Sequence, residues 1–461
     1  MTRRQWLASL LAASTAQAQQ QRPNIVFILA DDLGWSDLGC YGADLHETPN
    51  LDRFATQSVR FTNACSTGPV CSPTRASIMT GKHPAKLHMT TWLENAEHPA
   101  TNRKLLPPIT KENLPHGEVT IAEVLHDAGY YTAIIGKWHL GNAGFYPETQ
   151  GFDINIGGTF WGAPPTYFYP YKALQSNGEF RYVPHLENGK PGEYLTDRLT
   201  DEALKVIDNA KGRPFFLYLA HHTVHTPIEA KPGMAEKYEK KIKPGMRHKN
   251  AKYAAMTQSL DESVGRVLAK LDQLNLAKNT IVIFHSDNGG YIQQNITDNY
   301  PLRSGKGSLY EGGVRVPLMI RWPGVTPAGK VSHEPVVSAD LYPTMLAMTG
   351  LAGDAKHNAD VYGKSLAPLL KQPSAQLDRD ELFFHYPHYY PTTTPVSAIR
   401  TREWKLLEYF EDGHLELYNL KDDPSEKNDL AALMPEKARE LRARLNDWRI
   451  QTGAQVPTKR I

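Results

Sequence analysis

Residues 24–32 read NIVFILADD, and this stretch sets the fold class that the rest of the chain continues. Its β-favouring residues predict a strand over 24–29, which ends in two carboxylates, Asp31 and Asp32. Ligands of open α/β sheets bind beyond the carboxyl ends of the strands. The two carboxylates therefore stand where an α/β protein would place a site.

Further apolar runs repeat this pattern, because polar or charged residues directly follow each of them. The runs predict strands over 131–135, 214–220 and 280–284. Helical segments alternate with them, predicted around 48–61, from about Ser72, from the Thr120-x-x-Glu123 capping box to Gly129, and over 251–274. This βαβα order predicts an α/β fold, a large α/β/α sandwich around a mostly parallel, mixed sheet. Four strand ends would then converge on one rim, where we expect a ligand-binding site.

The sequence pattern changes after about residue 372, where aromatic, strand-like segments replace the βαβα order. The predicted elements are strands over 382–390, 398–410 and 414–419, an Asp412-Gly413 turn before the last strand, and a charged helix over 435–450. These elements predict a smaller C-terminal antiparallel sheet packed by one helix. We therefore divide the chain into a larger domain over 22–372 and a C-terminal subdomain over 373–461.

Residues 1–18 are typical of a cleavable export signal. Arg3 and Arg4 form a basic start, residues 6–13 an apolar stretch, and Ala16-Gln17-Ala18 a small-residue cleavage site. The apolar stretch is shorter than the roughly 20 residues that span a bilayer. We therefore expect a periplasmic or secreted protein, exported by the general or the twin-arginine route.

The composition excludes several classes of protein. Lys and Arg number 51 against 49 Asp and Glu, so a net charge of +2 gives no field that would draw the chain to nucleic acid or anionic lipid. Heptads, charge blocks and low-complexity runs are missing, which excludes a coiled coil or a disordered chain, and a polytopic membrane protein is excluded too. The three cysteines are too few for a disulfide scaffold, and their odd number leaves one that needs an explanation.

The strongest chemical signal is residues 71–81, Cys-Ser-Pro-Thr-Arg-Ala-Ser-Ile-Met-Thr-Gly. The residues after Cys71 are helix-like, with Pro73 in the first turn, so Cys71 is predicted at or just before a helix N-terminus. Backbone N–H groups and the helix dipole favour anions at that point. On these residues alone, a buried cysteine before a helix and a solvated Arg75 explain the pattern equally well.

The order Cys-x-Pro-x-Arg, then Ala-Ser-x-x-Thr-Gly, resembles the signature of the type I sulfatases, the formylglycine-dependent branch of the alkaline phosphatase superfamily. The resemblance extends from Arg22 to Pro424. It implies that a formylglycine-generating enzyme oxidises Cys71 to formylglycine, whose aldehyde is hydrated to a geminal diol. One diol oxygen would attack the sulfate sulfur, and deprotonation of the other would expel sulfate, which a plain thiol cannot do. The remaining cysteines, Cys40 and Cys65, then either pair or stay free.

Oxygen ligands for a metal follow two of the predicted strands. Asp31 and Asp32 follow the first, and Asp287 and Asn288 follow the strand over 280–284. Carboxylate and amide oxygens without His or Cys suit Ca²⁺ better than Zn²⁺. The resemblance implies the same, a single Ca²⁺ that also contacts the formylglycine made from Cys71. Each pair by itself would equally be the end of a strand or a turn.

A set of cationic residues completes the site that the resemblance implies. Lys137 and His139 lie in Gly-Lys-Trp-His-Leu-Gly, where the family's lysine binds sulfate and its histidine handles the diol proton. Arg75 matches the arginine that steadies the hydrated aldehyde. Lys306, in Arg-Ser-Gly-Lys-Gly, matches a lysine that contacts sulfate near the leaving oxygen. His225 matches the general acid that protonates the leaving group.

Two histidine positions depart from the family pattern. The family usually shows Pro-His-x-Pro at the general acid, whereas this chain has Val-His-Thr-Pro around His225. His221 and His222 lie close enough in sequence to compete for that role. His285 precedes Ser-Asp-Asn where the family more often has a small residue, and it either lines the pocket or ends the strand.

Aromatic residues are frequent between 145 and 194 and in the run 385–390. Such rings either stack against sugar faces or fill the core, and the sequence leaves both interpretations open. Together with the resemblance to carbohydrate-active sulfatases, the first favours a sulfated carbohydrate of the galactose or N-acetylgalactosamine sulfate type. The substrate would then be a small-molecule or oligosaccharide sulfate ester.

Two other functions stay open at this point. A phosphodiesterase or phosphonate monoester hydrolase of the same superfamily would use the same aldehyde. A non-catalytic relative would bind sulfated glycan with Cys71 unmodified. A zinc phosphatase is disfavoured, because it would need histidine ligands and a Ser or Thr nucleophile. The sequence does not indicate an oligomeric state.

Overall fold

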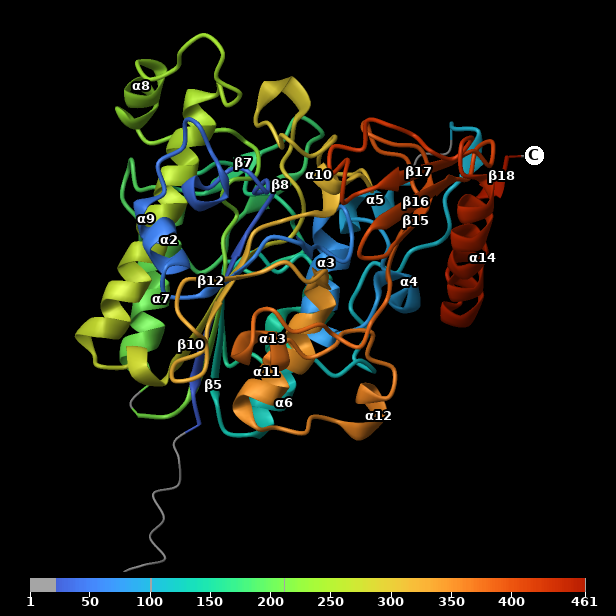
Figure 1. Ribbon diagram of the computed structural model, residues 1–461. Helices are drawn as coiled ribbons and strands as arrows, with labels where there is room; N and C mark the ends of the chain where they lie inside the picture. Colours follow the sequence, from blue (N-terminus) through green and yellow to red (C-terminus); the bar gives the residue numbers. More distant parts are fainter. Residues whose placement is uncertain (1–21, 100–101, 211, 461) are drawn as a thin grey trace, which may run out of the picture.

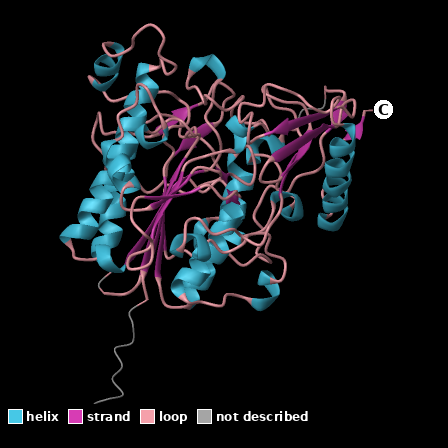
Figure 2. Cartoon of the chain, in the orientation of Figure 1, coloured by secondary structure: helices cyan, strands magenta, loops and turns pink. Residues whose placement is uncertain are grey.

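The computed structural model describes residues 22–99, 102–210 and 212–460, and it shows a large sheet between two layers of helices (Figure 1). The predicted signal, residues 1–18, lies outside the described residues. Figure 2 shows the strands of the large sheet in the middle of the bigger part of the molecule, with helices on both sides. The predicted α/β/α sandwich is therefore confirmed.

The large sheet has eight strands in the order β12-β2-β11-β10-β1-β9-β5-β6. Their bounds in that order are Lys330–Ser332, Val59–Phe61, Leu318–Arg321, Thr280–Ser286, Asn24–Ala30, Phe215–Ala220, Tyr131–Gly136 and Ile154–Ile156. β1 pairs in parallel with β10 on one side and with β9 on the other, and β5 pairs in parallel with β9. β11 runs antiparallel to both of its neighbours, so the sheet is mixed but mostly parallel. The four strands predicted to carry the site are adjacent.

Helices cover both faces of the sheet, and the side chains of β1 alternate between the two cores. Ile25, Phe27 and Leu29 pack toward one layer of helices, and Val26 and Ile28 pack toward the other. The first layer is α3 (Cys71–Thr80), α6 (Ile121–Asp127), α11 (Leu341–Thr349) and α13 (Ala367–Lys371). The second layer is α2 (Pro49–Ala55), α7 (Leu195–Asn209) and α9 (Ala251–Gln273). Because both faces are covered, β1 has no polar face, as in other buried parallel strands.

A smaller antiparallel sheet of four strands lies near the C-terminus, as predicted. Its strands are β14 (Leu382–Tyr386), β15 (Val396–Arg400), β16 (Trp404–Tyr409) and β17 (Leu415–Asn419). Helix α14 (Pro435–Thr452) covers one face, where Leu441 and Leu445 pack near Leu406. The other face packs against the larger part of the molecule, where Leu407 shares a core with Val70.

Three predicted elements are wrong in their extent. The strand predicted over 382–390 ends at Tyr386, the last residue of β14. The segment 48–61, predicted as one helix, is helical in α2 only to Ala55, because Val59 and Phe61 belong to β2 and pair with β11 and β12. The segment 398–410, predicted as one strand, belongs to the hairpin of β15 and β16. Its turn is closed by the backbone N–H of Trp404, which donates to the Thr401 hydroxyl at 2.9 Å.

The remaining elements are short and connect or flank the two sheets. They are α4 (Pro84–Leu87), α5 (Leu93–Glu97), α8 (Met234–Glu239), α10 (Glu311–Val314), α12 (Ala355–Asn358), and the paired strands β3 (Ala64–Cys65) with β13 (Val336–Val337), β4 (Leu105–Leu106) with β18 (Thr458–Lys459) and β7 (Lys172–Leu174) with β8 (Phe180–Tyr182).

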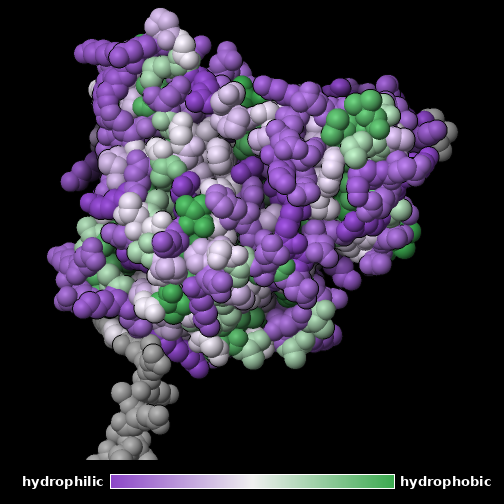
Figure 3. Space-filling model, in the orientation of Figure 1, coloured by the Kyte–Doolittle hydropathy of each residue, from purple (hydrophilic) through white to green (hydrophobic). Residues whose placement is uncertain are grey.

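In the described part of the chain, no helix is both long and apolar enough to cross a membrane. The face in Figure 3 is mostly hydrophilic, with small separate apolar patches. Cys40, Cys65 and Cys71 are free thiols.

Candidate active site

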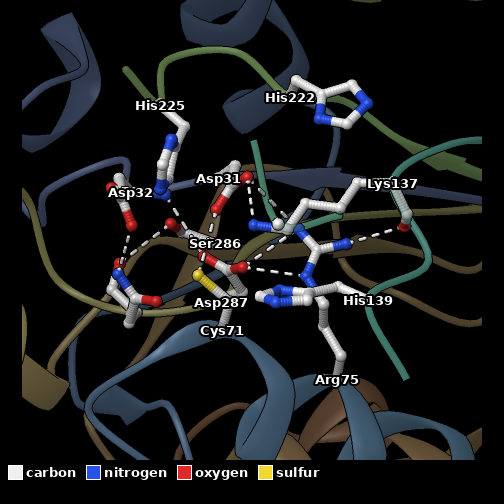
Figure 4. Close-up of polar contacts among 12 residues, drawn as sticks. Asp31, Asp32, Cys71, Arg75, Lys137, His139, His222, His225, Ser286 and Asp287 are labelled. Atoms are coloured by element: carbon white, nitrogen blue, oxygen red, sulfur yellow. Dashed lines mark hydrogen bonds and ion pairs between the residues drawn. The ribbon is translucent and has the colours of Figure 1, made fainter. Parts of the chain in front are cut away.

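Polar side chains from four adjacent strands meet at one edge of the large sheet (Figure 4). Asp31 and Asp32 follow β1, Lys137 follows β5, His225 lies in the segment after β9, and Asp287 follows β10. These strands are parallel, so their carboxyl ends bring residues that are far apart in the sequence to one place. The structure therefore assembles the predicted site residues around the start of α3.

Cys71 is the first residue of α3, directly after the extended residue Val70. The residue is 2% exposed, and its Sγ lies 3.5 Å from Asp31 Oδ1 and 3.6 Å from Lys306 Nζ. Burial raises the pKa of the Cys71 thiol well above its ordinary value. A thiol that stays protonated at neutral pH is a poor nucleophile. The position of Cys71 therefore suits catalysis, but its unmodified side chain does not.

Each carboxylate at the rim has a buried cationic partner. The shortest N–O distances are 2.7 Å for Lys137–Asp31, 2.8 Å for Lys306–Asp32 and 2.9 Å for Arg75–Asp287. Burial acts to raise the pKa of Asp32, but Lys306 lowers it below the ordinary value. Burial and the neighbouring Asp31 raise the pKa of Asp287 to about 6 despite Arg75. The rim therefore retains repulsion between carboxylates that a bound cation would relieve.

The oxygen donors at this edge, which are the carboxylates of Asp31 and Asp32 and the amide oxygen of Asn288, suit a hard divalent cation. Ligand atoms of Asp31, Asp32, Cys71 and His225 all lie within 4.8 Å of one another. Asn288 donates through Nδ2 to Asp32 Oδ1 at 2.7 Å, while its buried Oδ1 accepts no hydrogen bond from any described residue. Buried carbonyl oxygens are rarely left unpaired, and an amide oxygen beside carboxylates is a typical Ca²⁺ ligand.

His225 is the histidine after β9 that reaches the site. Its Nε2 lies 3.6 Å from Asp32 Oδ2, and its Nδ1 lies 2.8 Å from the carbonyl oxygen of Thr226. Burial and the nearby Lys306 lower the pKa of His225 to about 4. The negative charge of a bound sulfate ester would act in the opposite direction. His225 is thus placed to exchange a proton next to Asp32.

The competing histidines, His221 and His222, do not line the cavity that His225 lines. The imidazole of His221 lies 2.9 Å from the hydroxyl of Ser263, and His222 is 3% exposed with neither ring nitrogen paired to a described residue. His285 is fully buried within β10, with its Nε2 2.8 Å from the Ser338 hydroxyl. His285 therefore ends the strand and does not line the pocket.

His139 is held by a carboxylate that the sequence analysis did not single out. His139 Nε2 lies 2.7 Å from Glu94 Oε2, and Glu94 Oε1 accepts the backbone N–H of Gly162 at 2.9 Å. Burial acts to raise the pKa of Glu94, but His139 and the Gly162 amide lower it below the ordinary value. An ionised carboxylate only accepts, so the imidazole proton lies on Nε2. The buried Nδ1 of His139, which has no hydrogen-bond partner among the described residues, is left as an acceptor.

These side chains open into a cavity of about 300 Å³. The cavity is lined by ionisable and aromatic side chains that come from several segments of the chain. The lining residues are Asp32, Cys71, Trp92, Glu94, His139, Gly162, Ala163, Arg181, His225, Thr226, Tyr291, Lys306 and Tyr390. A pocket of this size is at the small end of the range for organic ligands, roughly 300–1,000 Å³. It has room for a compact group such as one sulfated sugar ring.

Comparison with known proteins agrees with this arrangement. The family model described as Sulfatase matches residues 23–351, more than half of the chain. The chain belongs to the sulfatase family. A second model, described as N-sulphoglucosamine sulphohydrolase, C-terminal, matches residues 305–451 of this sulfatase. The protein is therefore a sulfuric ester hydrolase of the alkaline phosphatase superfamily, and the resemblance stated from the 71–81 motif is confirmed.

Curated relatives and a solved structure are similar to this sulfatase over most of its length. A sulfatase from Formosa agariphila is 34% identical, in an alignment that covers 97% of this chain and 92% of the relative. The human N-acetylgalactosamine-6-sulfatase is 36% identical and covers 77% of this chain and 67% of its own. The crystal structure of Ps i-CgsB matches with a TM-score of 0.79 at 30% identity, covering 93% of both chains.

The sequence analysis missed several cavity residues of this sulfatase, among them Trp92, Glu94, Arg181 and Tyr291. Trp92 and Glu94 lie at the start of α5, in a segment without a polar strand end or a recognisable motif to mark it. Arg181 lies in the β7–β8 hairpin, which is equally unmarked. A single sequence holds no local signal for such residues, because only the tertiary structure brings them to the rim.

The ring-rich segments of this sulfatase are divided between core and cavity. Tyr167 and Tyr171 are fully buried, so these rings fill the core. Trp161 packs under the guanidinium of Arg181, 4.8 Å from the ring centroid, and Arg181 lines the cavity. Tyr390, the last residue of the run 385–390, also lines the cavity. The core interpretation therefore holds for Tyr167 and Tyr171, whereas stacking of a sugar on Tyr390 stays a prediction.

Proposed function

We propose that this sulfatase removes sulfate from a carbohydrate, of the galactose or N-acetylgalactosamine sulfate type, using a formylglycine made from Cys71 and one Ca²⁺. The observation that carries the proposal is the position of Cys71. It stands at the first residue of α3, 3.6 Å from Lys306 Nζ and 3.5 Å from Asp31 Oδ1. A helix N-terminus and a cation favour an anion at this point, next to oxygen donors for a metal.

Cys71 would not act as a thiol, since burial keeps it protonated. In this proposal a formylglycine-generating enzyme oxidises it during maturation. The hydrated aldehyde supplies one hydroxyl that attacks the sulfate sulfur and a second whose deprotonation releases sulfate. Arg75 is held by Asp287 and by the carbonyl oxygen of Lys137, each at 2.9 Å. In this position it would steady the hydrated aldehyde at residue 71.

Lys137 and Lys306 would bind the sulfate oxygens. Burial acts to lower the pKa of each lysine, but Asp31 raises that of Lys137 and Asp32 raises that of Lys306. Both lysines therefore stay charged at neutral pH. Fixed cations of this kind stabilise the charge that builds on the sulfate and leaving oxygens.

His139 and His225 would handle the two protons of the reaction. His139 presents a free Nδ1 because Glu94 holds the proton on Nε2, so it would accept the proton from the residue-71 hydroxyl. His225 lines the same cavity and would donate a proton to the leaving sugar oxygen. The geometry favours His225 over His221, which bonds Ser263 outside the cavity.

Asp31, Asp32, Asp287 and Asn288 would hold the Ca²⁺. The unpaired Oδ1 of Asn288 and the repulsion that raises the pKa of Asp287 support this assignment. When bound, the ion supplies positive charge that polarises the sulfate and lowers the pKa of a neighbouring hydroxyl. Removal of Ca²⁺ by a chelator should therefore lower activity, and added Ca²⁺ should restore it.

The proposed substrate class rests on two relatives and on the cavity. Human N-acetylgalactosamine-6-sulfatase is 36% identical to this chain, and Ps i-CgsB, at 30% identity, was solved in complex with k-i-k-neocarrahexaose. The aromatic residues Trp92 and Tyr390 line the cavity and offer apolar faces to a sugar ring. We further propose export by the signal over 1–18, a catalytic domain over 22–372 and a C-terminal subdomain over 373–461.

The test is sulfate release from a panel of esters by protein produced with a formylglycine-generating enzyme. The panel holds an aryl sulfate, an aryl phosphate diester, and galactose and N-acetylgalactosamine sulfates, each with and without chelator. We expect release from the aryl sulfate and at least one sugar sulfate, and none from Cys71→Ala. Faster cleavage of the phosphate diester would favour the phosphodiesterase alternative. Glycan binding without any turnover would favour the non-catalytic alternative.

A further inference from the structure

A second, larger hollow adjoins the catalytic cavity and shares one residue with it. Its volume is about 910 Å³, against about 300 Å³ for the catalytic cavity. Tyr390 lines both spaces, and Asn95 of the hollow is the neighbour of Glu94 in the cavity. The small cavity has room for one sugar ring, so the next sugar of a chain must leave it. The hollow meets the cavity at Tyr390 and is therefore within reach of such a sugar.

Aromatic rings lead from the cavity into the hollow. Trp92 lines the cavity and contacts Tyr390 edge to face, with ring centroids 5.5 Å apart. Tyr389 lines the hollow, and its hydroxyl donates to Glu411 at 2.5 Å and accepts the backbone N–H of Leu105 at 3.1 Å. A ring fixed in this way offers a rigid apolar surface at little entropic cost. The C–H faces of sugar rings pack on such surfaces and remove apolar area from water.

The hollow also holds a cation that is not neutralised by the protein. Arg103 is exposed, and its guanidinium lies 5.5 Å from the centroid of the Tyr389 ring. Its neighbour Lys104 is paired with Glu411 at 3.2 Å, whereas Arg103 has no carboxylate partner in the described part of the chain. Guanidinium groups bind sulfate and carboxylate oxygens through paired N–H donors. The hydroxyl of Thr393 donates to the carbonyl oxygen of Thr394 at 2.8 Å, so it can still accept a hydrogen bond from a sugar hydroxyl.

We propose that this hollow is the subsite for the second sugar of a sulfated glycan, with Arg103 binding an anionic group on that sugar and Tyr389 packing against its ring. The inference rests on the proposed function, because it places the scissile sulfate at Cys71. It assigns the enzyme to oligosaccharide or polysaccharide chains rather than to free monosaccharides. The anionic group is a sulfate or a carboxylate, and a loss on galactan sulfate oligosaccharides, which carry no carboxylate, identifies a sulfate.

The test compares Arg103→Ala with a matched control, Lys249→Ala. Lys249 lines another hollow, which shares no lining residue with the catalytic cavity. Substrates are an aryl sulfate, a sulfated monosaccharide, and galactan sulfate and chondroitin sulfate oligosaccharides of two, four and six sugars. We expect Arg103→Ala to lower kcat/KM on one oligosaccharide type by about tenfold at low salt and less at high salt. The aryl sulfate and the monosaccharide should change by less than about twofold, and Lys249→Ala should change nothing.

The subsite is contradicted if Arg103→Ala lowers all substrates equally or leaves the oligosaccharides unchanged. Loss confined to the galactan series assigns a sulfate to Arg103, because those sugars carry no carboxylate. Binding of the six-sugar probes to Cys71→Ala protein gives a readout that is independent of turnover. If the wild-type enzyme cleaves no sulfate ester, the proposed function fails, yet binding that weakens with Arg103→Ala would still support the subsite. Absent binding, or binding indifferent to Arg103, would overturn it.

Discussion

The carboxylates of the site differ in the groups they hold, and these differences separate their roles. Asp31 and Asp32 pair with lysines that line or adjoin the cavity, whereas the partners of Glu94 among the described residues are His139 and a backbone amide. Glu94 therefore does not neutralise a sulfate-binding cation. Its effect on the reaction passes through the proton position on His139.

A substitution of Glu94 tests this positioning role. Glu94→Ala should lower kcat about tenfold or more, because His139 loses the acceptor that fixes its Nε2 proton, and it should change the pH profile of kcat. Glu94→Gln, which still offers an acceptor oxygen, should retain more activity. Glu97→Gln on the exposed face of α5 is the matched control. Equal losses in Glu94→Ala and Glu94→Gln, or a pH profile that stays unchanged in both, would argue against the role.

His225 gives a second prediction, about the leaving group. His225→Ala should slow sugar sulfates by about 10² or more but slow activated aryl sulfates much less, since an activated aryl oxide leaves without a proton. Steady-state kinetics on one substrate of each kind measures the ratio. Equal slowing of both would point to another acid or to none.

The sequence pointed to residues at the ends of predicted elements or in family motifs, and it missed those that stand in neither. Cys71, Asp31 and Asp287 stand at element ends, where a strand or helix pattern marks a polar residue as exposed to a shared rim. Glu94 and Arg181 reach the cavity from short segments with no such pattern. Their position depends on tertiary packing, which a single sequence does not display.

The C-terminal sheet is joined to the larger part of the molecule by a buried ion network around α10. Glu311, the first residue of α10, lies 3.0 Å from Lys405 Nζ and 3.2 Å from Arg400 Nε, and Lys405 also lies 3.0 Å from Glu426. Burial acts to raise the pKa of Glu311, but Arg400 lowers it below the ordinary value, and burial raises the pKa of Glu426 to about 7. Because α10 follows the loop that carries Lys306, this network also supports one wall of the site.

Removing the central carboxylate should destabilise this junction. Glu311→Ala leaves Lys405 and Arg400 buried without their main partner, and we expect it to lower the free energy of unfolding by about 3–5 kcal/mol in urea titrations. Glu403→Ala, at a surface ion pair with Lys421, should cost less than about 1 kcal/mol. A change below about 1 kcal/mol for Glu311→Ala would show that the network does not hold the two parts together.

Elements were predictable where their hydrophobic pattern is long and were misjudged where it is short. The capping box at Thr120 and the long amphipathic pattern of α9 gave the correct helices, because many residues support one period. The three-residue strand β2 was absorbed into the helix before it, since Val59 and Phe61 fit either period. Pairing with β11 makes this segment a strand, and β11 lies more than 250 residues away in the sequence.

At the scale of the whole molecule, one buried histidine should make stability depend on pH. His248 Nε2 lies 3.3 Å from Asp37 Oδ1 and its Nδ1 lies 2.7 Å from Asp44 Oδ1, while the His46 ring packs against it at 4.4 Å. Burial acts to lower the pKa of His248, but Asp37 and Asp44 raise it from 6.5 to about 9. The protonated form is therefore bound more tightly in the folded state. Its contribution is full below about pH 6.5 and is lost as the pH rises through about 9.

The free energy of unfolding should accordingly fall between pH 6.5 and 9, by an amount on the order of 2 kcal/mol from this group. In His248→Gln the same decline should be smaller, because the neutral side chain does not titrate. His414→Gln at an exposed site is the control, and it should decline like the wild type. An identical pH slope in wild type and His248→Gln would contradict the assignment.

The central claim is that the sheet rim and α3 together form a site whose nucleophile derives from Cys71. Its most direct test is the mass of the tryptic peptide from Phe61 to Arg75, isolated from protein produced with a formylglycine-generating enzyme. The account predicts an aldehyde or its hydrate at position 71, with Cys65 in the same peptide unchanged. An intact thiol at Cys71, in protein that still releases sulfate, would contradict the proposed mechanism. An intact thiol in inactive protein that binds sulfated glycan would instead identify a binding protein built on the sulfatase fold.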